Sequence, residues 1–166
     1  MNAAVMLFAV IVGAVLHAAL PAAWLGGTPL NPMLGIVIYY ALMHGRLAML
    51  GAAIVAGLIE DGMGMMPLGY SSFAYCLVGW MVEEFREVVL VREVPTHVLF
   101  GSLGACCSSL AEWLLLVKDG LVQPEPLVLL IRLLGSALAA AIVVPLVFAL
   151  MVRIDTLVGN LEEVDA

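Results

Sequence analysis

Long apolar stretches alternate with short polar ones along the chain, and their lengths predict membrane-spanning helices. A helix that crosses the hydrocarbon core of a bilayer needs about 20 residues. Three stretches reach that length: Ala3–Leu25, Thr96–Val117 and Leu127–Val152. A fourth, Leu68–Val82, begins after Pro67 and ends before a cluster of charges. The pattern therefore predicts an all-α, polytopic integral membrane protein.

The stretch Pro32–Ile59 fits either one long helix or two short helices that break at His44–Arg46. One helix would place Arg46 near the bilayer centre, where a charge costs about 2.5–3.5 kcal/mol, so we expect two. Each would hold about 13–15 apolar residues, fewer than a full span needs. The predicted total is six transmembrane helices, with five or a re-entrant segment as the alternative.

Composition agrees with this pattern. Hydrophobic residues make up 64% of the 166 residues and charged residues 11%, whereas a soluble domain carries roughly 25% charged residues. We therefore expect a single transmembrane helical domain over residues 1–166 and no soluble domain. The formal net charge of −7 leaves no basic surface for phosphates, which excludes nucleic acid as a partner.

The positive charges predict an orientation. Short cytoplasmic loops are enriched in Lys and Arg. With the N-terminus in the cytoplasm, Lys118 and Arg132 face outward, and four cations face inward: Arg46, Arg86, Arg92 and Arg153. We therefore expect both termini in the cytoplasm and the segment Gly57–Gly69 at the outer surface.

That segment, GLIEDGMGMMPLG, carries two adjacent carboxylates among glycines. One interpretation is a solvated acid pair that marks a helix end. The other is an ordered outer loop whose carboxylate binds backbone amides, a ligand or a partner. Pro67 and Gly69 open the next helix, and its unpaired N–H groups attract an anion, so Asp61 is placed to be that anion. The candidate loop residues are Gly57, Asp61, Gly64, Pro67 and Gly69.

Glu112 and Arg132 form a second candidate. Each lies about six residues from the short loop 118–125 on consecutive antiparallel helices, which predicts the same depth for both. We expect that the two side chains can form an intramembrane ion pair. An acid within a membrane helix indicates a functional site, and a structural clamp between the two helices is the other interpretation.

Small residues recur on one helix at a spacing of four: Gly101, Ala105 and Ser109. This small-xxx-small pattern lets membrane helices approach closely. It predicts either packing within the bundle or a surface for a partner helix.

Catalytic motifs are missing from the sequence. The three histidines are scattered, and no HExxH, GxSxG or P-loop pattern occurs. We therefore expect no catalytic residue, no metal site and no cofactor, so the chain is not predicted to be an enzyme.

The segment Tyr39–Gly79 resembles the MreD family, small polytopic membrane subunits of the bacterial rod-shape machinery. The shared elements are the break HGR and a set of residues around the acid–glycine loop: Gly51, Gly57, Leu58, Asp61, Gly64, Pro67, Leu68, Gly69, Tyr75 and Gly79. The resemblance implies an inner-membrane scaffold without catalytic activity, in contact with membrane lipid. It also implies binding to MreC, and through it a link between MreB and the peptidoglycan synthases, RodA and a class B penicillin-binding transpeptidase.

A different class of protein is the alternative. The MreD fold is similar to that of the substrate-binding subunits of vitamin transporters of the energy-coupling-factor type, which resemble this chain in size. Such a subunit needs a polar cavity at its outer face. Apart from Glu60, Asp61, Glu112, Arg132 and a few hydroxyls, the sequence offers few polar groups for one.

Overall fold

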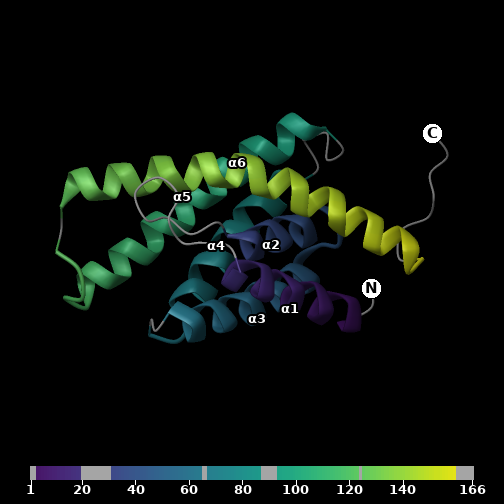
Figure 1. The fold of residues 1–166 in the computed structure, drawn as a ribbon, viewed down its shortest axis with the longest axis horizontal. Helices are drawn as coiled ribbons and strands as arrows, with labels where there is room; N and C mark the ends of the chain where they lie inside the picture. The colour runs from purple at the N-terminus through teal and green to yellow at the C-terminus, as the bar shows by residue number, and fades with distance from the viewer. Residues whose placement is uncertain (1–2, 20–30, 65–66, 87–92, 124, 160–166) are drawn as a thin grey trace.

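The computed structural model describes residues 3–19, 31–64, 67–86, 93–123 and 125–159. These residues form six α-helices and contain no β-strand, as the sequence predicts. In chain order (Figure 1), the helices are α1 (Ala3–Ala19), α2 (Pro32–Met43), α3 (Arg46–Gly64), α4 (Tyr70–Glu84), α5 (Val94–Lys118) and α6 (Pro126–Leu157).

The apolar stretch with two possible interpretations forms two helices, α2 and α3, so that prediction is confirmed. The chain turns at His44 and Gly45, where Gly45 has a φ of 85°, a left-handed conformation that glycine adopts with little strain. Arg46 therefore lies at a helix end, with its side chain 60% exposed. It forms ion pairs with Glu83 and Glu84 of α4, at 2.7 and 3.3 Å.

Helix lengths differ from the prediction at two places. α3 has 19 residues and runs to Gly64, beyond the predicted end at Ile59. α1 is described to Ala19, and the rest of the predicted span, to Leu25, lies outside the described residues. Three helices, α3, α5 and α6, are long and apolar enough to cross a membrane, whereas the described parts of α1 and α2 are shorter apolar helices.

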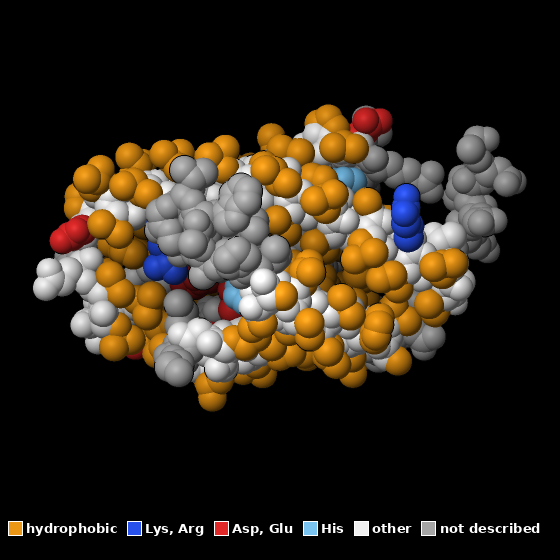
Figure 2. All heavy atoms as spheres, viewed as in Figure 1, with side chains coloured by type: hydrophobic (Ala, Val, Ile, Leu, Met, Phe, Trp, Pro, Cys, Tyr) orange, Lys and Arg blue, Asp and Glu red, His pale blue; other side chains and the backbone are white. Residues whose placement is uncertain are grey.

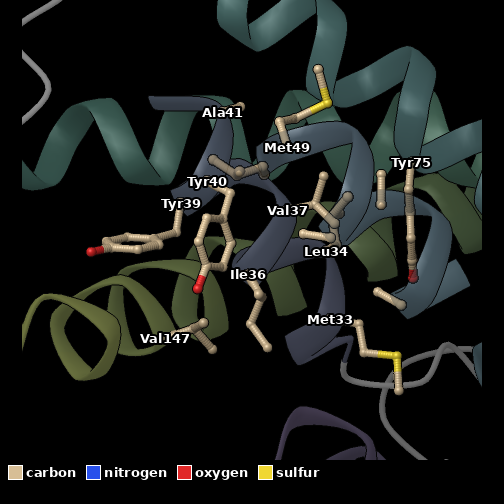
Figure 3. Packing of buried hydrophobic residues seen from close by; sticks show 14 of the residues in the cluster. Met33, Leu34, Ile36, Val37, Tyr39, Tyr40, Ala41, Met49, Tyr75 and Val147 are labelled. Carbon is tan, nitrogen blue, oxygen red and sulfur yellow. The ribbon is translucent and has the colours of Figure 1, made fainter. Parts of the chain in front are cut away.

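The short helix α2 forms the centre of the bundle. Eleven of its 12 residues are buried, and it contacts each of the other five helices. Figure 3 shows Tyr39 and Tyr40 projecting from α2 toward α6, where Val147 lies. A helix that is apolar on all sides is typical of a buried position, and α2 occupies such a position.

The outside of the bundle is mostly apolar. Leu47, Ile142 and Leu146 are 89%, 61% and 66% exposed, and hydrophobic side chains cover most of the face in Figure 2. Soluble proteins rarely expose contiguous apolar patches larger than a few hundred Å². Contact with lipid explains such a surface.

The two ends of the bundle differ in chemistry. One end of the bundle, called the acidic end below, holds Glu60 and Asp61. The starts of α2, α4 and α6 and the end of α5 also lie there. The opposite end, called the His44 end, holds the α2–α3 turn and the ends of α4 and α6. The start of α1 and the end of α6 lie on the same side of the bundle (Figure 1).

Candidate functional site

Asp61 joins the last turn of α3 to the first turn of α4. Its side chain is buried, with 1% of the residue exposed. Oδ2 accepts a hydrogen bond from the Gly69 N–H at 2.6 Å, and Oδ1 accepts one from the Ser71 N–H at 3.0 Å. The first N–H groups of a helix have no partner within it, and the helix dipole favours an anion there. This is the contact that the sequence led us to expect for Asp61.

Two glycines of the loop have conformations or neighbours that only glycine permits. A Cβ atom on Gly57 would lie 2.3 Å from both the backbone N and the Cα of Ser72. The absence of a side chain there allows α3 and α4 to touch, and the Ser72 hydroxyl donates to the Ile54 carbonyl at 3.2 Å. Gly69, before α4, has a φ of 104°, in the left-handed region.

The other two candidate loop residues show no such requirement. Gly64 is the exposed last residue of α3, and Pro67 is partly buried ahead of α4. Residues 65–66 between them lie outside the described residues. The contacts that order this loop therefore come from Gly57, Asp61 and Gly69.

Glu60 has a separate set of partners. The Asn31 side-chain amide donates to Oε1 at 2.7 Å, and the Tyr75 hydroxyl donates to Oε2. Asn31 also caps α2, because its Oδ1 accepts from the Leu34 N–H at 3.3 Å, which is a stabilising contact at a helix start. Glu60 thus connects the beginning of α2 with α3 and α4, and the acid pair as a whole holds three helices together.

A polar cavity of about 40 Å³ lies beside Glu60 at the acidic end. Its wall is formed by α3, α5, α6, the start of α2 and Asn31 before it. Its polar wall consists of two carboxyl groups, one guanidinium group, one amide and three serines. The main polar residues are Asn31, Glu60, Ser109, Glu112, Arg132 and Ser136.

Glu112 and Arg132 both line this cavity and their opposite charges interact, but no direct ion pair joins the two side chains. The ion pairs among the described residues involve His44, Arg46 and their partners. The spacing from the α5–α6 loop predicts depth along the bundle, and both side chains do lie at the level of the cavity. It does not predict how far apart the two side chains lie across the bundle.

The small-residue stripe of α5 faces the inside of the bundle. A Cβ on Gly101 would lie 2.9 Å from the Val144 Cβ of α6. Ala105 is buried, and both Ala105 and Ser109 line the polar cavity. Of the two interpretations, these contacts favour packing within the bundle.

A second buried polar cluster lies at the His44 end. Asp155 of α6 is fully buried. Its Oδ2 accepts from the Tyr39 hydroxyl at 2.5 Å and lies 3.3 Å from His44 Nε2. His97 of α5 stacks on Phe148 with ring centroids 3.7 Å apart. The sequence did not single out this cluster, because its members are far apart in the chain and each is a lone polar residue in an apolar stretch.

The described part of the chain holds no group of three His, Cys, Asp or Glu side chains arranged for a metal ion. Comparison of the chain with protein-family models, with curated proteins and with solved structures found no match.

Proposed function

We propose that this protein is a multi-pass protein of the bacterial inner membrane and a non-catalytic scaffold of the cell-elongation machinery, as the resemblance to MreD implies. In this proposal it binds MreC and, through MreC, links MreB to RodA and a class B penicillin-binding transpeptidase. The N- and C-termini face the cytoplasm, and the acidic end faces outward.

The observation that carries the proposal is the use of Asp61. Both of its oxygens accept backbone N–H bonds, and the residue is 1% exposed. A buried carboxylate with both oxygens occupied is poorly placed to move a proton of a substrate. It orders the α3–α4 connection instead, which is what a binding surface requires.

The residues shared with the MreD pattern support the same role. Gly57 permits the close contact between α3 and α4, and Gly69 shapes the turn before α4. A hairpin fixed in this way presents a rigid surface, so that a partner pays little ordering entropy when it binds. The apolar outer sides of the helices suit lipid or the single membrane helix of a bitopic partner.

Depletion of the protein in its own cells tests the proposal. We expect cells to widen and become round, because elongation synthesis loses its link to MreB. Re-expression of the wild type and of Arg153→Gln, a change at an exposed position of α6, should restore the rods. Cells that keep their width after complete depletion would contradict the proposal.

The polar cavity favours a second candidate, the substrate-binding subunit of an energy-coupling-factor type transporter. The cavity brings together Glu60, Glu112, Arg132 and the serine hydroxyls that the sequence offered, together with the Asn31 amide. That candidate requires stable association with two ATPases and a larger membrane coupling subunit. Co-purification separates the two functions, because a scaffold would instead recover a bitopic protein and cell-wall synthases.

A further inference from the structure

His44, the C-cap residue of α2, has one ring nitrogen with a partner and one without. Nε2 lies 3.3 Å from Asp155 Oδ2, and the side chain is 10% exposed. Nδ1 is buried and has no hydrogen-bond partner in the described part of the chain. Because buried polar atoms are nearly always hydrogen-bonded, the unpaired nitrogen needs an explanation.

The two protonation states of His44 differ in how well they fit this site. The neutral ring has one N–H. With its proton on Nε2 it can donate to Asp155, and Nδ1 is then a bare acceptor. The imidazolium has a second N–H on Nδ1, and that donor would be buried without an acceptor. A buried unpaired donor on a charged ring costs more than a bare acceptor on a neutral one, so the geometry favours the neutral ring.

Hydroxyl and carboxyl groups of α2 and α6 lie beside the ring. The Tyr39 and Tyr40 rings are 5.6 and 5.0 Å from the His44 ring, measured between centroids. Asp155 of α6 is shared, because the oxygen that faces His44 Nε2 also accepts a hydrogen bond from the Tyr39 hydroxyl at 2.5 Å. His44 therefore does not have this carboxylate to itself.

Basic groups approach from the other helices. Arg86 follows α4 and extends to the α2–α3 turn, since a Cβ on Gly45 would lie 3.2 Å from Arg86 Nη1. Arg46 begins α3, but its charge is paired with two glutamates of α4. His97 of α5 is further away and stacks on the phenylalanine of α6 that contacts Tyr39. The nearby positive charge of Arg86 opposes a second proton on the His44 ring.

The pKa of His44, in the turn between α2 and α3, agrees with this geometry. Burial has the largest effect and lowers the pKa below its ordinary value. Arg86 and the N-terminal amino group lower the pKa further, whereas Asp155 raises it and is outweighed. The folded chain thus binds this proton less tightly than the unfolded chain does. A proton bound at His44 therefore destabilises the folded arrangement.

We propose that the His44–Asp155 contact is a pH-sensitive connection: it holds the α2–α3 turn against the end of α6 while His44 is neutral, and it opens when His44 binds a second proton. α2 contacts each of the other helices, so release of its end changes the packing of the whole His44 end. The connection is independent of the scaffold role. In the proposed orientation this end faces the cytoplasm, and the connection responds to the pH there.

Thermal unfolding of the detergent-purified full chain between about pH 8 and about pH 5 measures the effect on stability. The contribution of neutral His44 is complete above the pKa of an unfolded histidine, about 6.5, and is lost as the pH falls below it. The comparison is with His44→Gln, which keeps an N–H donor for Asp155 but cannot titrate. We expect the wild-type melting temperature to fall by at least about 2 °C more than that of the variant.

The other titrating groups are the same in both proteins, so the difference between the two curves isolates His44. His17→Gln is the matched control, because it removes a histidine of α1 that lies outside this cluster. Its melting temperature should fall with pH as that of the wild type does, whatever its absolute value.

Amide hydrogen exchange, measured by mass spectrometry and corrected for the intrinsic effect of pH on exchange, locates the change. In the wild type we expect the α2–α3 turn and residues 151–157 at the end of α6 to lose protection at about pH 5, while the acidic end keeps its protection. In His44→Gln the same segments should be equally protected at both pH values.

Parallel melting curves for the wild type and His44→Gln would overturn the proposal. A wild type that gains stability relative to the variant on acidification would overturn it as well, since protonation would then strengthen the contact. If the variant does not fold, exchange in the wild type decides, and unchanged protection of the turn and of the end of α6 would refute the opening. None of these results depends on recovery of MreC or on cell shape.

Discussion

Substitution of Gly57 by alanine is the strongest test of how α3 and α4 pack. The new Cβ would lie 2.3 Å from two backbone atoms of Ser72, whereas ordinary contacts of a Cβ begin at 3.4 Å. Since the atoms it meets belong to the backbone, no side-chain rotation can relieve the clash. The two helices must separate by about 1 Å, because a close-packed interior offers no free volume.

The magnitude follows from what that separation disrupts. Overpacking typically costs about 1–3 kcal/mol. The Asp61 bonds to Gly69 and Ser71, now 2.6 and 3.0 Å, and the Ser72 bond to Ile54 at 3.2 Å lie across the same contact. A lengthening of about 1 Å exceeds normal hydrogen-bond distances. We therefore expect Gly57→Ala to lower the free energy of unfolding by about 3–5 kcal/mol.

The assay is thermal unfolding of the detergent-purified protein, followed by tryptophan fluorescence. In a chain of this length the loss corresponds to a decrease in melting temperature on the order of 10 °C. Gly62→Ala is the matched control, since it lies on the same helix and its Cβ would meet no atom within 4 Å. That variant should melt at or slightly above the wild-type temperature, because alanine favours a helix by about 0.5–1 kcal/mol. Equal melting temperatures for the two variants would refute the close approach of α3 and α4.

Three further substitutions test other contacts by the same unfolding assay. Asp61→Asn keeps one acceptor for the two N–H groups and loses the charge at the start of α4, so we expect a loss of about 1–2 kcal/mol; an unchanged melting temperature would contradict the capping role. Tyr39→Phe leaves the buried Asp155 without its 2.5 Å donor and should cost about 1–3 kcal/mol, and a variant as stable as the wild type would show that this bond contributes nothing. Arg46→Ala removes only exposed ion pairs to α4 and should cost less than about 1 kcal/mol; a loss as large as that of Gly57→Ala would mean that the His44 end is less exposed than the structure has it.

The helices were readable from the sequence because their apolar lengths depend on local composition. The break before Arg46 could be predicted since a charge within a single long helix is costly. The length of α3 could not be predicted, because Glu60 and Asp61 seemed to mark a helix end. Both residues instead lie within the last turns of α3. Glu60 accepts hydrogen bonds from Asn31 and Tyr75, and Asp61 accepts from the backbone at the start of α4.

The candidate site was predictable only in part, for a related reason. The contact of Asp61 is nearly local, eight and ten residues along the chain, so loop chemistry was sufficient to suggest it. The cavity brings together groups from four separate segments, and spacing along a helix gives no distance across a bundle. That is why Glu112 and Arg132 were expected to form an ion pair, although they line one cavity without a direct one. It is also why Asn31, which lies far from them in the sequence, was not expected beside them.

Affinity purification of the tagged protein from its own membranes, in gentle detergent and with partners identified by mass spectrometry, tests the scaffold role most directly. The proposed function predicts stoichiometric recovery of a bitopic MreC-like protein, together with a RodA-type glycosyltransferase and a class B transpeptidase. Recovery of paired ATPases with a larger membrane coupling subunit, and of none of these cell-wall proteins, would contradict it.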